Sequence, residues 1–127
     1  MEKVYISEAG PEVSAAIYGF WRWTTPALSS IKKVEDIVNY NLDLGINTFD
    51  HSNNYGDGKI EELFGKAIQA KSFDREDIII STKCGIRKSA KVGNGKYYDL
   101  SAEHIRESVE KSLKNLRTEY IDIFLLE

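Results

Sequence analysis

Short apolar runs and amphipathic stretches alternate along almost the whole chain. Between residues 31 and 44 the apolar positions recur every three to four residues, which predicts a helix that stops at Gly45. The same period predicts a helix over residues 59–71 and a third helix, capped by Ser101, whose apolar stripe ends at Leu116. The runs typical of strands are residues 4–6, 13–17 with a continuation to 23, 46–50, 78–83 and 120–126.

Two connecting segments stand out between these elements. The first two strands are separated by a segment that contains Gly10-Pro11, a strong turn signal, so residues 1–17 are predicted to form a β-hairpin. The segment 84–99 is polar and contains Gly85, Gly93 and Gly95. We predict that it is a long loop, a kind of segment that often carries function.

The predicted order is a hairpin followed by β-α-β-α-β-α-β. Each helix is long enough to return the chain, so the strands are expected to be parallel with right-handed connections. This order fits a doubly wound sheet or one half of a (β/α) barrel. The bulky Gly19-Phe20-Trp21 replaces the glycine-rich phosphate loop expected after the first strand of a dinucleotide-binding fold, which favours the barrel.

Composition narrows the class of protein. A chain of 127 residues is long enough for one domain with a core. A net charge of -3 without a basic block gives no reason to expect nucleic acid. No apolar run approaches the roughly 20 residues that span a membrane, and the start lacks a signal-peptide pattern. Cys84 is the only cysteine, so no internal disulfide forms, and we expect a cytoplasmic location.

Polar side chains follow two of the predicted strands. Asp50 and Lys83 stand at strand ends, and Tyr55 follows Asp50 in a loop. Because the carboxyl ends of parallel strands meet at one edge of the sheet, the three side chains are expected to gather there. A phenol with a pKa of about 10 donates a proton poorly, and an adjacent ammonium improves it by stabilising the phenolate. A structural ion pair beside a half-buried tyrosine is the alternative that spacing alone leaves open.

The segment 45–56, Gly-Ile-Asn-Thr-Phe-Asp-His-Ser-Asn-Asn-Tyr-Gly, followed by Glu61–Ala67, resembles the signature of the aldo-keto reductase family. Residues 80–85 look like that family's third strand with its lysine, and residues 108–124 are similar to its third helix and fourth strand. Tyr18–Trp21 looks like the end of its first strand. The resemblance covers nearly the whole chain in order and is greatest to the bacterial oxidoreductase branch.

The resemblance implies a TIM barrel. Residues 1–127 are then one partial domain: the N-terminal half of a (β/α)8 barrel, in which a bottom-closing hairpin (residues 1–17) precedes a parallel (βα)3β unit. A complete barrel needs about 250 residues, so this chain is about half of one. The family's fourth strand ends on a histidine that orients the carbonyl, and here Glu127 takes that position.

The resemblance also implies the reaction, the reduction of small aldehydes and ketones with NADPH. In that pattern Tyr55 is the proton donor, Lys83 assists it and Asp50 completes the relay. Gly19, Phe20 and Asp50 are the expected cofactor contacts, and Trp21 is expected to line the substrate pocket.

Two interpretations of the chain's function stay open. The first is an NADPH-dependent carbonyl reductase represented by its N-terminal half, which alone is expected to bind NADPH weakly or not at all and to turn over no carbonyl. The second is a non-catalytic half-barrel fragment or a protein that keeps the fold for interaction. In either case the open sheet edges are expected to invite self-association. Asp50, His51, Cys84 and His104 lack ligand spacing, so no metal is predicted.

Overall fold

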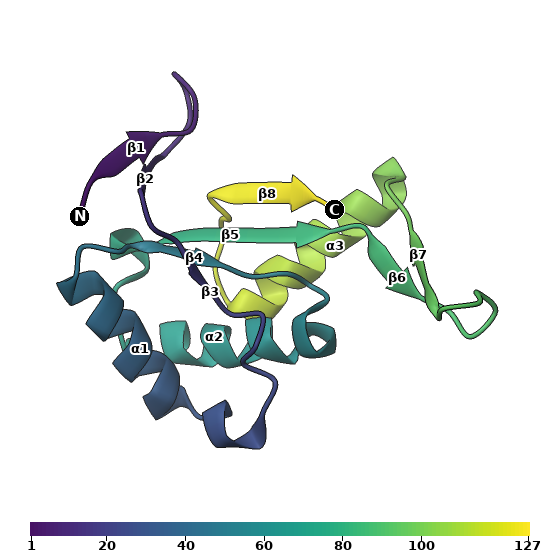
Figure 1. The fold of residues 1–127 in the computed structure, drawn as a ribbon, viewed down its shortest axis with the longest axis horizontal. Coiled ribbons are helices and arrows are strands. Elements are labelled where there is room, and N and C mark those ends of the chain that lie inside the picture. The colour runs from purple at the N-terminus through teal and green to yellow at the C-terminus, as the bar shows by residue number, and fades with distance from the viewer.

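A four-stranded parallel sheet forms the centre of the computed structural model, which describes all 127 residues (Figure 1). Its order is β3-β4-β5-β8, and each neighbouring pair is parallel. The strands are β3 (Tyr18–Gly19), β4 (Thr48–Asp50), β5 (Ile79–Cys84) and β8 (Ile123–Leu126). The predicted α/β fold, an N-terminal hairpin followed by a parallel half-barrel sheet, is confirmed.

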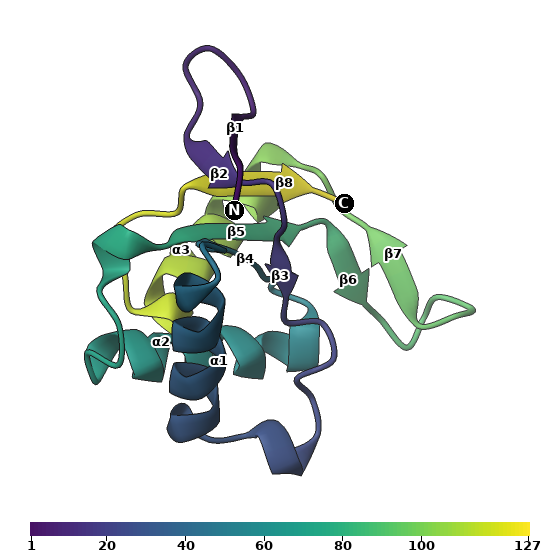
Figure 2. The ribbon, with the colours of Figure 1, turned by 60° about the vertical axis from the view of Figure 1, so that its left-hand side comes forward.

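Three helices cover one face of this sheet (Figures 1 and 2). They are α1 (Ile31–Asp43), α2 (Lys59–Gln69) and α3 (Ala102–Leu116), each within two residues of its predicted end. The side chain of Ser30 caps α1 by accepting from the Lys33 backbone, and Ser101 caps α3 in the same way. Single 3-10 turns, Pro26–Leu28, Tyr55–Gly58 and Arg75–Asp77, connect the larger elements.

The close packing of α2 on α3 depends on Gly65. A Cβ at this position would lie 2.1 Å from the backbone oxygen of Asn115 in α3. Only a residue without a side chain allows the two helices to approach this closely.

Two antiparallel hairpins flank the central sheet. The predicted N-terminal hairpin is present as β1 (Lys3–Tyr5) and β2 (Glu12–Ser14), with Val4 opposite Val13. The second hairpin consists of β6 (Ile86–Lys88) and β7 (Lys96–Tyr98). The prediction of one long loop over residues 84–99 was therefore wrong. The Asn94-Gly95 pair, a strong hairpin signal, lies at the end of the turn, where Gly95 has a φ of 73°.

The hydrophobic core lies between the sheet and the helices. Phe49 and Ile80 point to the helices and are fully buried against side chains such as Phe64 of α2. Because side chains alternate along a strand, Asp50 and Lys83 project from the opposite face, which no helix covers. The sheet therefore separates an apolar, helix-covered side from an open side with polar residues at its carboxyl end.

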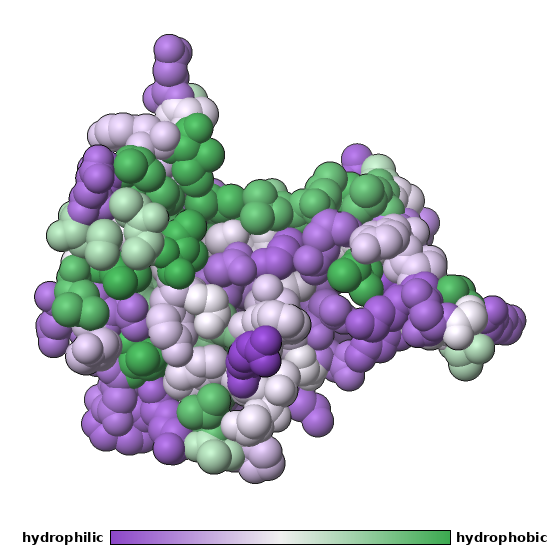
Figure 3. Space-filling model, in the orientation of Figure 1, coloured by the Kyte–Doolittle hydropathy of each residue, from purple (hydrophilic) through white to green (hydrophobic).

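Apolar side chains also reach the surface near the sheet edge. Figure 3 shows a hydrophobic band over β8 and a second one beside the N-terminal hairpin. Large apolar residues with more than a third of their surface exposed include Val4, Ile6, Ile17, Leu125 and Leu126. None of the helices has the length and apolar character needed to cross a membrane.

Candidate active site

An ion pair joins the ends of β4 and β5. The Lys83 ammonium donates to both carboxylate oxygens of Asp50, at 2.9 Å and 2.8 Å, and to the backbone carbonyl of His51 at 2.8 Å. The Lys83 side chain is only 12% exposed and that of Asp50 28%. Parallel pairing places the two strands in register, with Asp50 opposite Ser81, and this brings the two side chains to one edge.

Tyr55 lies against this pair. It opens the 3-10 turn after β4, where its backbone N–H donates to the carbonyl of Ser52 at 3.1 Å. The Lys83 nitrogen lies 5.0 Å from the centre of the Tyr55 ring. The predicted gathering of Asp50, Tyr55 and Lys83 at the carboxyl end of the sheet is therefore confirmed as geometry.

The surroundings of Lys83 keep it charged. Burial alone disfavours the ammonium, but hydrogen bonds and charge interactions with Asp50 and Tyr55 outweigh it. The net result is a pKa of Lys83 above its ordinary value of 10.5. A cation is thus fixed beside a phenol at neutral pH, which is the arrangement that lets a phenol act as an acid.

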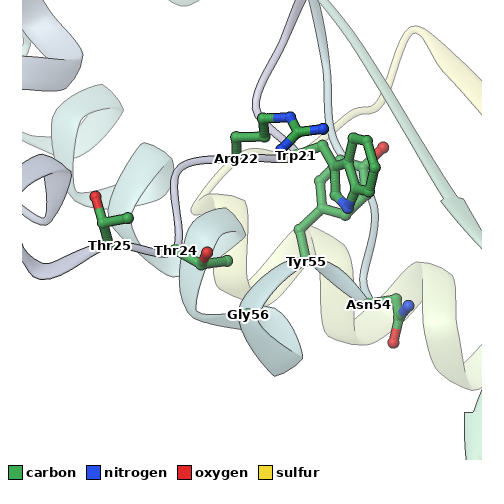
Figure 4. A pocket seen from close by; sticks show the side chains of 7 residues that line it. All are labelled: Trp21, Arg22, Thr24, Thr25, Asn54, Tyr55 and Gly56. Atoms are coloured by element: carbon green, nitrogen blue, oxygen red, sulfur yellow. The ribbon is translucent and has the colours of Figure 1, made fainter.

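A cavity of about 450 Å³ opens beside Tyr55 (Figure 4). Its walls come from the segment after β3 and from the loop after β4. The lining residues are Trp21, Arg22, Thr24, Thr25, Asn54, Tyr55 and Gly56. Trp21 is 63% exposed, and the Arg22 guanidinium lies 4.6 Å from the centre of its ring. Trp21 was expected to line a pocket from the sequence, whereas the contributions of Thr24, Thr25, Asn54 and Gly56 were not foreseen.

The two expected cofactor contacts on the first barrel strand face different environments. Gly19 is exposed and lies opposite Asp50 in the sheet, and a Cβ built there would meet nothing within 4 Å. Phe20 is only 1% exposed, and its ring stacks on His51 at 4.6 Å between centres. The Phe20 backbone is also engaged, because its N–H donates to the Asp50 carbonyl at 3.0 Å and its carbonyl accepts from the Trp23 N–H at 3.1 Å.

His51 belongs to the core beneath the site. Its ring is fully buried between Phe20 and Phe64, and neither ring nitrogen has a hydrogen-bond partner. Burial, with a further contribution from the charge of Lys83, lowers the pKa of His51 to about 3. His51 therefore points away from the open face, on the same side of β4 as Phe49, and packs in the core.

Glu127 lies next to the site at the end of β8. Its backbone N–H donates to the Cys84 carbonyl at 2.9 Å, and its carboxylate accepts from the Ser52 hydroxyl at 2.9 Å. Ser52 was not among the residues expected from the sequence, although it stands inside the segment that carries the family resemblance. No group of three or more His, Cys, Asp or Glu side chains in the chain is arranged to hold a metal ion.

These features define a class of protein. The chain is a parallel α/β half-barrel with its polar cluster at the carboxyl ends of the strands, the edge where enzymes built on such barrels carry their active sites. A model of the aldo/keto reductase family matches residues 16–127. The chain belongs to the aldo/keto reductase family.

Curated relatives and solved structures agree with this assignment. The chain is 35% identical over 130 residues to the oxidoreductase YdhF of Escherichia coli, covering 99% of this chain and 42% of the relative. It is also 35% identical to the 6-dehydroglucose reductase of Agrobacterium fabrum, of which it covers 43%. The holo structure of the aldo-keto reductase AKR11C1 from Bacillus halodurans is also similar, at 32% identity and a TM-score of 0.78. The aligned region covers 99% of this chain and 40% of the AKR11C1 chain. The chain thus spans less than half the length of these relatives.

Proposed function

We propose that the chain is the N-terminal part of an enzyme that reduces small aldehydes and ketones to alcohols with NADPH. The observation that carries this proposal is the Lys83 ammonium, held by Asp50 at 2.8 Å and 2.9 Å and placed against Tyr55 beside an open cavity. Membership of the aldo/keto reductase family supports it.

The residues present fit the nicotinamide end of such a cofactor. The space beside Gly19 is open, and the partly exposed Asp50 borders it in the sheet. Gly19 and Asp50 would hold the nicotinamide against the strand ends, and the buried Phe20 would support the end of the first strand beneath it. The cofactor supplies a hydride to the carbonyl carbon when it is bound.

Each residue of the cluster then has a defined task in the reduction. The Tyr55 hydroxyl would donate a hydrogen bond to the carbonyl oxygen and transfer its proton to that oxygen. Lys83 stabilises the phenolate that Tyr55 leaves behind, because an opposite charge close by favours the ionised form. Asp50 keeps Lys83 charged and holds it in place with two hydrogen bonds.

The length of the chain limits what it does alone. It spans 42% and 43% of the two curated relatives, so a large part of their architecture has no counterpart here. We expect the 127-residue chain to bind NADPH weakly and to turn over no carbonyl without the remaining barrel elements. The cytoplasm is the proposed location, which the single buried cysteine, Cys84, suits.

The decisive experiment measures NADPH oxidation with a panel of small aldehydes. The chain is assayed alone and fused to the C-terminal part of the YdhF relative. We expect turnover only in the fusion, and a loss of about 10²- to 10⁴-fold in kcat on Tyr55→Phe. Tyr120→Phe, a change of an exposed tyrosine outside the site, serves as the control. Turnover by the chain alone contradicts the expected inactivity, and a folded fusion without activity contradicts the reductase proposal.

A non-catalytic interaction protein is the second candidate, and a specific observation favours it. Strands β3 and β8 are open edges of the sheet, and Leu125 and Leu126 at the β8 edge are about half exposed. Unpaired strand edges with apolar side chains pair readily with another chain. Self-association is therefore proposed for the isolated chain, and sedimentation velocity that shows a monomer over a wide concentration range would count against it.

A further inference from the structure

The guanidinium of Arg22 is a free cation in the cavity beside Tyr55. Arg22 lines this cavity but forms no ion pair. The cations that do pair with carboxylates are Lys32, Lys83, Lys88, Arg75 and Arg87. The donors of Arg22 are therefore available to a ligand.

The Trp21 ring holds this guanidinium in place. The central carbon of the Arg22 guanidinium lies 4.6 Å from the centre of the ring, and Figure 4 shows both side chains on the Tyr55 side of the cavity. Stacking on an aromatic face orients the planar group and leaves its edge free for hydrogen bonds. A lysine would supply the charge without this fixed plane.

The rest of the cavity wall is electrically neutral. Its other polar members, Thr24, Thr25 and Asn54, carry no charge. The nearby Lys83 charge is balanced by Asp50 at hydrogen-bond distance. Arg22 is thus the one charged residue in the wall, and a single fork of donors matches a carboxylate better than a phosphate dianion, which usually recruits several cations.

We propose that Arg22 determines substrate specificity by binding the carboxylate of an oxo acid whose carbonyl group lies at Tyr55. This inference rests on the proposed reductase function for the identity of the reacting group. The contact between Arg22 and the carboxylate is a binding property, and it is measurable without turnover. A cavity of about 450 Å³ accommodates a small molecule with both groups.

The test measures binding of an unreactive pair of probes to the full 127-residue chain. The probes are 4-hydroxybutanoate, the alcohol that reduction of an oxo acid would give, and its neutral amide. Trp21 lies in the cavity wall in contact with Arg22, so its fluorescence reports occupancy. The variants are Arg22→Gln, Arg22→Lys, Tyr55→Phe and, as a matched control, Arg87→Gln, whose arginine pairs with Asp99 outside this cavity.

We expect the acid to bind more tightly than the amide and Arg22→Gln to weaken acid binding about tenfold, the loss that about 1.4 kcal/mol produces. Arg22→Lys should retain part of the affinity, and Arg87→Gln all of it. Equal binding of acid and amide, no binding of the acid, or an unchanged affinity in Arg22→Gln would each overturn the proposal. Tighter binding of inorganic phosphate than of the acid would overturn the assignment of a carboxylate.

The Tyr55→Phe variant separates this proposal from the reductase function. If it keeps the affinity for the acid, the Arg22 site stands whether or not the fused enzyme turns over carbonyls. If the fused enzyme is active but shows no preference for oxo acids over neutral aldehydes in kcat/KM, the reductase proposal stands and the Arg22 proposal fails.

Discussion

Acidification should destabilise the fold through His51. Its ring is fully buried between Phe20 and Phe64 without a hydrogen-bond partner, and its pKa is lowered to about 3. In the unfolded chain the imidazole returns to its ordinary pKa of about 6.5. The stability due to the neutral ring is therefore fully present above about pH 6.5 and is lost as the pH falls toward about 3.

The size of this effect follows from the two pKa values. At about pH 5 the imidazole is protonated in the unfolded state and neutral in the folded state. Protonation then raises the equilibrium constant of unfolding about 30-fold, so the free energy of unfolding falls by about 2 kcal/mol. At about pH 5.5 the loss is about 1.4 kcal/mol by the same relation. Either loss is a large enough part of a typical free energy of unfolding, about 5 to 15 kcal/mol, to be measured.

The assay is urea unfolding followed by circular dichroism between about pH 8 and about pH 5. His51→Phe keeps an aromatic ring in the same cluster and removes the titration, so its stability should vary less with pH than that of the wild type. His104→Gln is the control for the second histidine, which lies on α3 and is partly exposed. Burial raises the pKa of Glu61, which works in the opposite direction but equally in all three proteins.

The result that refutes this reasoning is an equal pH dependence in wild type and His51→Phe. The comparison uses differences between pH values, because extra volume in the core gives the phenylalanine variant its own constant cost of about 1 to 3 kcal/mol. If only His104→Gln flattened the profile, the exposed histidine would be responsible and the buried ring would not.

Three further predictions concern packing and charge. Gly65→Ala should lower the free energy of unfolding by about 3 kcal/mol, because its methyl group would collide with the α3 backbone, whereas Gly93→Ala, with open space around it, should change it by less than about 0.5 kcal/mol in urea unfolding. Cys84 is fully buried with a raised pKa, so the native thiol should react with a thiol reagent at least about tenfold more slowly than the urea-unfolded thiol, and equal rates would contradict this. Lys83→Met should lower the free energy of unfolding by about 1 to 2 kcal/mol, which is less than for a fully buried ion pair because Asp50 is partly exposed. An unchanged unfolding midpoint would show that the ion pair adds no stability.

The cluster of Asp50, Tyr55 and Lys83 was predictable because regular elements position it. Asp50 and Lys83 stand at the ends of parallel strands, and strand register together with alternation fixes both the edge and the face that their side chains occupy. Tyr55 follows closely enough in the chain to lie above the same edge. The periodicity of the apolar residues, which also predicted the helices, was sufficient for this part of the site.

The cavity beside the cluster was only partly predictable because irregular backbone builds it. Strand β3 has just two residues, so alternation gives no direction for Phe20, whose ring enters the core. The segment that follows carries Arg22 and Trp21 into the cavity wall, and no period describes its path. The β6–β7 hairpin was missed for a different reason, since its strands are short and mostly exposed and so lack an apolar pattern.

Lys83 links the open site to the buried core. On the open side its ammonium holds the Asp50 carboxylate and lies against Tyr55. On the inner side it donates to the His51 carbonyl at 2.8 Å, and its charge adds to burial in keeping the His51 ring neutral. A neutral, apolar-packed ring supports the strand end from which Asp50 projects, and the largely buried Lys83 cation favours the neutral state of that ring. The half-barrel can therefore hold the three catalytic candidates in place with its own residues, before any further barrel element contributes.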